Sequence, residues 1–109
     1  MRNAIAVINT GSSSIKFSVF DDHGPVLRRV LAGSIRGLGA SARYLVHDGG
    51  GRQLEVKDWP QSTSFGHGDA MAFLFDTVPT HLEGYRIQAV GHRVVHGGER
   101  FSQPVLIDP

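Results

Sequence analysis

The sequence predicts an α/β domain built from a β-meander, one helix and a further strand that follows the helix. Apolar and polar residues alternate from Ile15 to Val19, which is typical of a half-buried strand, and similar short segments recur along the chain. Residues 71–82 change to helical spacing, and residues 86–95 return to a pattern rich in β-branched residues. A strand that arrives after a helix can pair in parallel with an earlier strand.

The first two strands flank a turn rich in glycine and serine at residues 9–16. Residues 4–8 form an apolar run, and the segment after the turn places Ile15, Phe17 and Val19 on one face. Two strands joined by so short a turn predict a β-hairpin.

Three more strands are predicted before the helix, at residues 26–35, 42–47 and 53–59. The segment 48–52 contains three consecutive glycines and joins the last two strands as a second hairpin. It lacks converging donors and a following helix, so we interpret it as a flexible turn and not as a phosphate loop. A last short strand is predicted at residues 104–107.

The helix is predicted after a polar loop at residues 60–64 that is rich in helix-capping residue types. Four apolar residues then recur at helical spacing: Met71, Leu74, Val78 and Leu82. Pro79 cannot donate to the preceding turn and clashes with it, so the regular helix is expected to end near Thr77.

Other residues of the helical segment fit packing better than a cofactor site. Met71, Phe73 and Phe75 are expected to be core or packing residues. His67 and Asp69 are metal ligands by residue type, but a solvated helix entrance is the favoured interpretation.

Composition excludes several classes of function. The 109 residues are 40% hydrophobic, which is enough for one globular core. The net charge is +1 with interspersed signs, so we expect no nucleic-acid partner and no polybasic membrane surface. No cysteine is present, which excludes disulfides and thiolate metal sites and fits a reducing compartment. The apolar run after Met1 is too short for a signal peptide, so a cytoplasmic protein is expected.

The turn at residues 9–16 has the composition of a phosphate cradle. Backbone N–H groups, several hydroxyls and the ammonium of Lys16 would converge there, and Gly11 would let the backbone approach an anion closely. The alternative is an ordinary turn with a solvated lysine. The P-loop pattern fails, because it requires a glycine before its lysine and a helix after it. The Ser13-x-x-Lys16 acylation motif also fails, because its later partner motifs are absent.

A second informative stretch, residues 91–99, ends a predicted strand in a double glycine, where α/β folds place ligand sites. On a strand, His92 and His96 would lie about 13 Å apart, which excludes a shared metal. Arg93 and Val95 share the other face and offer a guanidinium beside a small apolar surface. A short carboxylic acid needs that pair of groups, although a surface salt bridge is an equally good explanation of Arg93 alone.

Together, Asn9-x-Gly-Ser-Ser-Ser-x-Lys16 and Gly91-His-Arg-Val-Val-His-Gly-Gly-Glu99 resemble the acetate kinase family, in order and approximate separation. The resemblance implies a ribonuclease-H-like domain of the acetate and sugar kinase, Hsp70 and actin superfamily, truncated here. Residues 1–109 would be the amino-terminal part of the first domain, and the rest of that domain and the second domain would be absent from this chain. The implied reaction transfers the γ-phosphoryl group of ATP to acetate, reversibly, with Mg²⁺ as cofactor.

The resemblance also implies a role for each matching residue. Asn9 would help to position Mg²⁺ through its water shell, and Ser12, Ser14 and Lys16 would bind the nucleotide phosphates. Arg93 would hold the carboxylate of the acyl substrate or the transferring phosphoryl group, and Val95 would form part of the substrate pocket around the methyl group. The family's catalytic residues lie beyond Pro109, so no catalytic residue is assigned in this fragment, and the chain alone is expected to be inactive.

Several alternatives remain open at this stage. Propionate kinase shares both motifs, and one methylene is worth only about 1–3 kcal/mol of discrimination. A stand-alone, non-catalytic phosphate- or nucleotide-binding module would use the hairpin without catalysis, and a small domain with no ligand is the third alternative. The resemblance implies a homodimer for the full-length protein.

Overall fold

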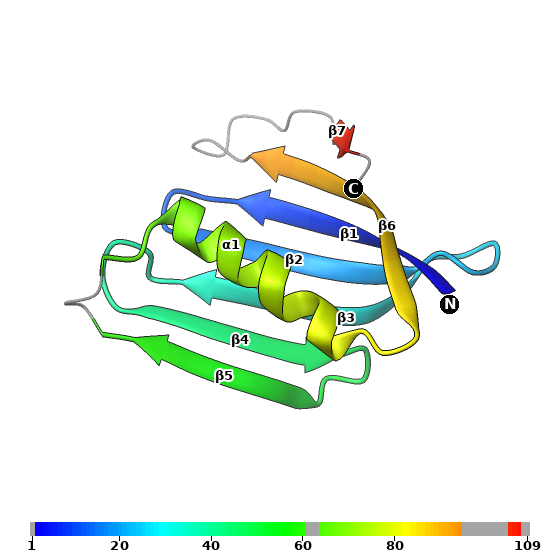
Figure 1. Ribbon diagram of the computed structural model, residues 1–109, viewed down its shortest axis with the longest axis horizontal. Coiled ribbons are helices and arrows are strands. Elements are labelled where there is room, and N and C mark those ends of the chain that lie inside the picture. Colours follow the sequence, from blue (N-terminus) through cyan, green and yellow to red (C-terminus); the bar gives the residue numbers. More distant parts are fainter. Residues whose placement is uncertain (1, 61–63, 95–104, 108–109) are drawn as a thin grey trace.

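The computed structural model describes residues 2–60, 64–94 and 105–107, which form a seven-stranded mixed sheet with one α-helix across one face (Figure 1). The strand order is β5-β4-β3-β2-β1-β6-β7. The strands are β1 (Arg2–Thr10), β2 (Ser14–Asp21), β3 (Arg28–Arg36), β4 (Ala42–Asp48), β5 (Gln53–Trp59), β6 (Tyr85–Val94) and β7 (Val105–Ile107).

The sheet confirms the predicted meander and the predicted parallel strand. Each of β1 to β5 pairs antiparallel with the next along the chain, while β6 returns from the helix and pairs in parallel with β1. Strand β1 therefore lies between its hairpin partner and the strand that follows the helix. Strands that are far apart in the sequence therefore meet at β1.

The third strand begins later than predicted, at Arg28 instead of residue 26. Gly24 has a φ of +107°, and Pro25 has no N–H to donate to a ladder, so the turn continues past both residues. The side chains of Val26 and Leu27 are 75% and 49% exposed at this turn. Their apolar character does not mark strand residues.

The helix ends where the sequence predicts. Helix α1 spans His67–Thr77 and passes into a single 3₁₀ turn, η1, at Val78–His81. Val78 still donates its N–H to Leu74, but Pro79 has no N–H for the next helical bond, so the chain tightens. No helix in the described part of the chain is long and apolar enough to cross a membrane.

The core lies between α1 and the face of the sheet that carries Ile15, Phe17 and Val19, as the alternation predicts. Leu74 and Ala70 are the helix residues buried against this face. Val78 and Leu82 are also buried, and Met71 and Phe73 pack partly against the cluster, which confirms these packing predictions. Phe75 is not a core residue, because it is 59% exposed. It follows Leu74 directly, and one residue of helix places it at the margin of the buried stripe, where it lines an apolar cavity.

Tyr44 is fully buried, yet its hydroxyl has no hydrogen-bond partner among the described residues. Its ring packs edge-on against Phe73 with centroids 4.8 Å apart. Burial, with a smaller contribution from the charge of Glu55, raises the pKa of Tyr44 to about 12. The ring is therefore well packed, while the hydroxyl is left unsatisfied.

We expect Tyr44→Phe to leave the free energy of unfolding unchanged or to raise it by about 1–2 kcal/mol, because it removes only the unsatisfied hydroxyl. Tyr85→Phe is the matched control, since that hydroxyl donates to Asp21 at 3.0 Å, and this change should lower stability. Urea unfolding of the two variants measures both effects. A loss of stability in Tyr44→Phe as large as that in Tyr85→Phe would contradict the prediction.

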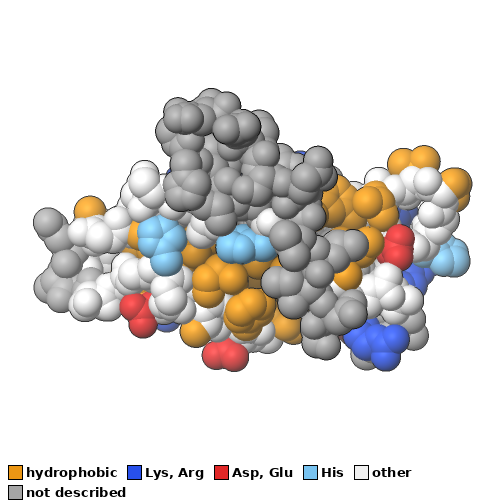
Figure 2. Space-filling model, turned by 90° about the horizontal axis from the view of Figure 1, so that it is seen from above, with side chains coloured by type: hydrophobic (Ala, Val, Ile, Leu, Met, Phe, Trp, Pro, Cys, Tyr) orange, Lys and Arg blue, Asp and Glu red, His pale blue; other side chains and the backbone are white. Residues whose placement is uncertain are grey.

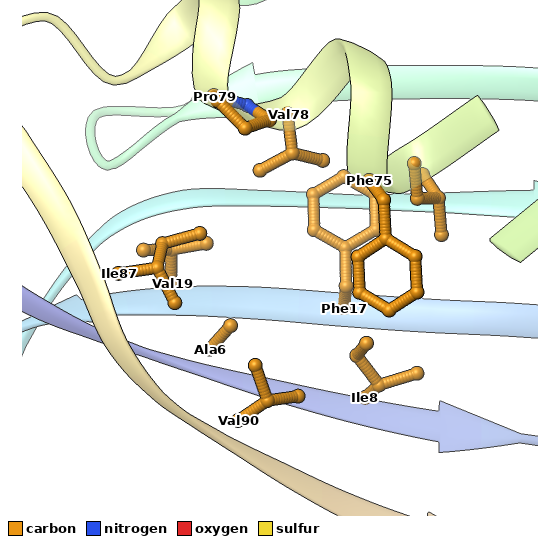
Figure 3. A pocket seen from close by; sticks show the side chains of 10 residues that line it. Ala6, Ile8, Phe17, Val19, Phe75, Val78, Pro79, Ile87 and Val90 are labelled. Atoms are coloured by element: carbon orange, nitrogen blue, oxygen red, sulfur yellow. The ribbon is translucent and has the colours of Figure 1, made fainter. Parts of the chain in front are cut away.

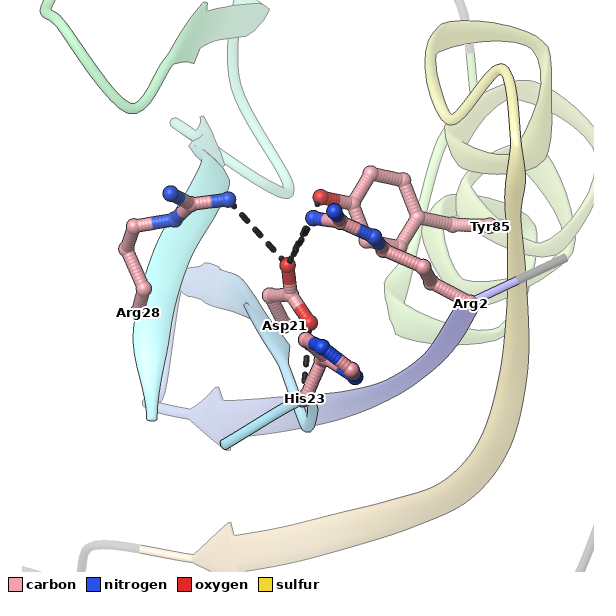
Figure 4. Close-up of polar contacts among 5 residues, drawn as sticks. All are labelled: Arg2, Asp21, His23, Arg28 and Tyr85. Carbon is pink, nitrogen blue, oxygen red and sulfur yellow. Dashed lines mark hydrogen bonds and ion pairs between the residues drawn. The ribbon is translucent and has the colours of Figure 1, made fainter. Parts of the chain in front are cut away.

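Asp21 anchors the end of the sheet where β1 and β6 begin (Figure 4). Asp21 is only 2% exposed. One of its carboxylate oxygens accepts hydrogen bonds from Arg2 at 3.1 Å, Arg28 at 3.1 Å and Tyr85 at 3.0 Å. The other oxygen accepts the backbone N–H of His23 at 2.8 Å. One carboxylate thus joins β1, β3 and β6.

The pKa of Asp21 reflects this environment. Burial acts to raise the pKa, but the hydrogen bonds that the carboxylate accepts and the charge of Arg2 outweigh burial, so the pKa lies below its ordinary value of 3.8. A carboxyl group with a lowered folded-state pKa stabilises the fold above its unfolded pKa. This contribution is lost as the pH falls through the folded value.

We therefore expect the Tm of this chain to fall steeply below about pH 4 and the Tm of Asp21→Asn to be lower at pH 7 but less dependent on acid. Asp58→Asn is the control. Its ion pair with Arg43 is solvent-exposed and should contribute little at pH 7. Thermal scans from pH 7 to pH 3 measure all three proteins. Equal acid sensitivity in the wild type and Asp21→Asn would rule out this role of Asp21.

Candidate functional site

The glycine-serine turn lies at the edge of the sheet where the parallel strands β1 and β6 end and α1 begins (Figure 1). In open α/β sheets, ligand sites lie outside the carboxyl ends of the parallel strands. The predicted phosphate cradle therefore occupies the position that this rule favours.

Three hydrogen bonds fix the turn. Gly11 donates its N–H to the carbonyl of Ser14 at 2.8 Å, and Leu38 donates its N–H to the carbonyl of Ser13 at 3.0 Å. The Nε2 atom of His67, at the start of α1, lies 2.8 Å from the carbonyl oxygen of Gly11. The carbonyls of Gly11, Ser13 and Ser14 are thus all engaged within the protein.

The donors of the turn remain available. Ser12 and Ser13 are exposed, and no described residue accepts a hydrogen bond from their N–H groups. A Cβ atom added at Gly11 would lie 3.2 Å from the Ser14 hydroxyl, a tight contact that the Ser14 side chain would have to rotate to relieve. Free N–H groups beside serine hydroxyls, with the carbonyls turned to internal partners, suit an anion.

The lysine, the asparagine and the arginine that the sequence singles out lie in one row across three strands. Asn9 in β1 is paired with Lys16 in β2 on one side and with Arg93 in β6 on the other. Asn9 and Lys16 alternate with the buried Ile8 and Ile15, so they lie on the face of the sheet opposite α1. Directly paired residues of an antiparallel ladder, such as Asn9 and Lys16, have Cβ atoms roughly 4.5–5.5 Å apart, close enough to contact one ligand.

The predicted residues divide into two groups. Asn9, Ser14 and Lys16 share one face next to the turn that holds Ser12, and Arg93 holds the adjoining register position in β6. Val95 and the segment containing His96, Gly97 and Gly98 lie outside the described residues. The structure therefore brings the phosphate-binding candidates together and places the backbone of Arg93 beside them.

His92 lies on the opposite face from this row. It is paired with the buried Ile8, and its Nε2 lies 2.7 Å from the Thr10 hydroxyl. This contact ties the end of β6 to the end of β1.

The residues that the structure describes would supply only part of the coordination sphere of a magnesium ion. No group of three His, Cys, Asp or Glu side chains among the described residues could hold a metal. Asp69 instead accepts the Gly66 N–H at 3.0 Å and caps α1, which agrees with a helix entrance. Asn9 offers an uncharged amide oxygen on the lysine face, which suits a contact through the ion's water shell.

A large apolar cavity, about 390 Å³, lies beside α1, on the face of the sheet opposite Asn9 and Lys16 (Figure 3). Apolar side chains gather on this side of the molecule (Figure 2). The cavity is lined by Ala6, Ile8, Phe17, Val19, Leu74, Phe75, Val78, Pro79, Ile87 and Val90. Because these side chains offer no polar group to orient an anion, the cavity is a poor candidate for the functional site.

The contact of His67 with the turn is not predicted by the sequence. The sequence predicts a solvated helix entrance there, but the ring is half-buried and contacts a residue 56 positions away in the sequence. No local spacing signals this contact, because it depends on where the sheet places the start of α1.

Residues 4–109 match the model of the Acetokinase family. The chain is 40% identical over 114 residues to acetate kinase of Rhizobium meliloti, covering 97% of this chain and 27% of that protein. It is 39% identical over 111 residues to acetate kinase of Rhodopseudomonas palustris strain TIE-1, covering 100% of this chain and 27% of that protein. The chain thus spans about a quarter of the length of these relatives.

Solved structures agree with these matches. A crystal structure of Porphyromonas gingivalis acetate kinase superposes with a TM-score of 0.66 at 29% identity, covering 98% of this chain and 27% of that one. A propionate kinase from Francisella tularensis superposes with a TM-score of 0.63 at 28% identity, covering 87% of this chain and 23% of that one. The predicted fold class, an α/β fragment of the acetate and sugar kinase type, is confirmed.

Proposed function

Because the chain belongs to the acetokinase family, we propose that it is the amino-terminal segment of an enzyme that phosphorylates acetate with ATP, reversibly forming acetyl phosphate and ADP. The observation that carries this proposal is the row of Lys16, Asn9 and Arg93 beside the turn. We further propose that residues 1–109 belong to the first, ribonuclease-H-like domain. The full-length protein would be a cytoplasmic homodimer, with neither nucleic acid nor membrane as a partner.

The nucleotide phosphates would lie against the turn. The N–H groups of Ser12 and Ser13 and the hydroxyls of Ser12 and Ser14 donate to phosphate oxygens without adding bulk. Lys16 is exposed on the adjoining strand and supplies a compact positive charge that follows the phosphoryl group during transfer. These groups hold the phosphoryl group in line, which is the main requirement of a reaction with little covalent chemistry for the protein.

The acyl substrate would lie on the β6 side of the row. A guanidinium at Arg93 offers two parallel N–H donors to the planar acetate carboxylate, and Val95 would contact its methyl group. Asn9 lies between the lysine and the arginine positions and would orient waters of a magnesium ion that arrives with ATP. That ion would supply charge neutralisation between the phosphates.

Propionate is the second candidate substrate, favoured by the likeness to the Francisella tularensis propionate kinase. The pocket for one extra methylene would depend on residues other than those described here, and the expected discrimination is about 1–3 kcal/mol. Relative kcat/KM for acetate and propionate, measured on the full-length protein, separates these candidates.

The test compares the full-length product of the natural gene with the 109-residue chain in a hydroxylamine-trapping assay for acetyl phosphate. We expect turnover with acetate and MgATP only in the full-length protein, because this chain supplies one side of a site that must exclude water. Absence of turnover with either acid in the full-length protein would refute the proposed function. Turnover by the 109-residue chain alone would refute the proposal that the rest of the full-length protein supplies groups that the reaction requires.

A further inference from the structure

The ring of His67 is the helix side chain that forms a hydrogen bond with the glycine-serine turn in the described structure. Its Nε2 lies 2.8 Å from the carbonyl oxygen of Gly11, across 56 residues of sequence. A carbonyl oxygen only accepts hydrogen bonds, so Nε2 must carry the hydrogen. The same N–H is present when the imidazole is neutral and when it is protonated, so the bond does not require a charged ring.

This bond is the third of the hydrogen bonds that hold the turn in place. The Gly11 N–H is held by Ser14 at 2.8 Å and the Ser13 carbonyl by Leu38 at 3.0 Å, both within the sheet layer and its loops. His67 is the tether that comes from the helix layer. Without it, the peptide unit between Gly11 and Ser12 has no partner for its carbonyl among the described residues.

Orientation of that peptide unit matters because its two ends are rigidly linked. The Gly11 carbonyl and the Ser12 N–H belong to one planar peptide and point in opposite directions. A hydrogen bond that draws the carbonyl toward α1 therefore turns the Ser12 N–H away from α1, toward the face of Asn9 and Lys16. His67 can set the direction of a donor that it never touches.

The helix start that carries His67 is itself held in place. Asp69 accepts the Gly66 N–H at 3.0 Å, and the neighbouring Ala70 is fully buried in the core. The imidazole is therefore presented from a fixed position, and its rotation is limited by a half-buried setting.

We infer that His67 is a positioning residue for phosphate binding, which orients the Ser12 N–H by holding the Gly11 carbonyl. The inference rests on the proposed function, since it assigns the anion to the nucleotide. Among the described residues, the hydrogen bond that His67 makes is to the turn and not to Asn9 or Lys16, so we assign its effect to the turn.

The test uses His67→Phe, which removes the donor, and His67→Gln, whose amide nitrogen replaces Nε2. In the full-length protein, we expect His67→Phe to raise the KM for ATP about 10-fold or more without changing the KM for acetate. His67→Gln should stay within about 3-fold of wild type, because the donor is restored. A change that acted only through general instability would lower kcat and leave both KM values unchanged.

His47→Phe is the matched control. The Nδ1 of His47 also bonds a backbone carbonyl, that of Asp48 at 3.1 Å, but Asp48 ends β4 at the edge of the sheet away from the turn. This change should leave the KM for ATP unaltered. An equal rise in His47→Phe would show that loss of any imidazole produces the effect and would overturn the inference.

A second readout does not depend on activity. Amide hydrogen exchange at Gly11, whose N–H closes the turn, should be about 10-fold faster in His67→Phe than in the wild type and restored in His67→Gln. A wild-type protein without turnover would refute the proposed function while leaving this readout intact. Unchanged exchange in His67→Phe, or an ATP KM equal to that of an active wild type, would overturn the role of His67.

Discussion

Replacement of Lys16 by alanine is expected to lower the kcat of the full-length protein about 100- to 1,000-fold, the cost of removing one group that stabilises charge in a transition state. Lys16 is exposed and lies beside the free donors of the turn, opposite the core face of the sheet. Removal of an exposed side chain alters stability little, so the loss would be one of catalysis. Steady-state kinetics with MgATP and acetate measure it.

Two variants sharpen this prediction. Lys57→Ala removes a lysine from the edge strand β5, where the ammonium packs over Trp59, and should keep wild-type kinetics. Lys16→Arg keeps the positive charge and should recover part of the activity, although its planar fork differs from a compact ammonium. Full activity in Lys16→Ala would remove the turn from the proposed mechanism.

Arg93→Ala is expected to reduce kcat/KM for acetate about 100-fold or more, with a raised KM for acetate and a smaller change in the KM for ATP. The reason for this difference between the two KM values is the pairing register of β1 with β2 and β6. Arg93 lies across from Asn9, one strand further from the turn than Lys16, so the carboxylate should lie nearer to it than the nucleotide does. Loss of a bidentate pairing to a carboxylate also removes its alignment.

Arg86→Ala is the control for Arg93, because Arg86 lies on the same strand near its start and is exposed. It should show wild-type KM values for both substrates. Titration of acetate and of ATP separately distinguishes the two arginines. A rise confined to the KM for ATP in Arg93→Ala would reverse the assignment of the two ends of the row.

Local patterns predicted the elements of this fold well, for identifiable reasons. Ile15, Phe17 and Val19 alternate with polar residues because one face of the strand is buried, and this alternation can be seen in the sequence. Pro79 stops the α-helix through its missing N–H, a property that needs no tertiary context. Val26 and Leu27 misled the prediction of the third strand because apolar residues in a turn look the same as those in a strand.

The candidate site was predicted only as far as its parts are contiguous in sequence. Residues 9–16 form a local turn, so a phosphate-binding role could be predicted for them from composition. That Asn9 lies between Lys16 and Arg93 depends on the parallel register of β1 and β6, which spacing does not specify. The contact of His67 with Gly11 and the hydrogen bonds that Arg2 and Tyr85 donate to Asp21 are tertiary in the same sense.

The central position of β1 in the sheet has a consequence for the order in which parts of the protein fold. Its pairing with β2 joins neighbouring segments, but its pairing with β6 joins distant ones, as the hydrogen bond between the side chains of Thr10 and His92, 82 positions apart, illustrates. Closing the larger loop costs more entropy and is slower. In a nascent chain leaving the ribosome, the hairpin that carries Lys16 can form long before the strand that carries Arg93 has been synthesised. The nucleotide side of the site would thus exist first, and synthesis of β6 would add the acid-binding side.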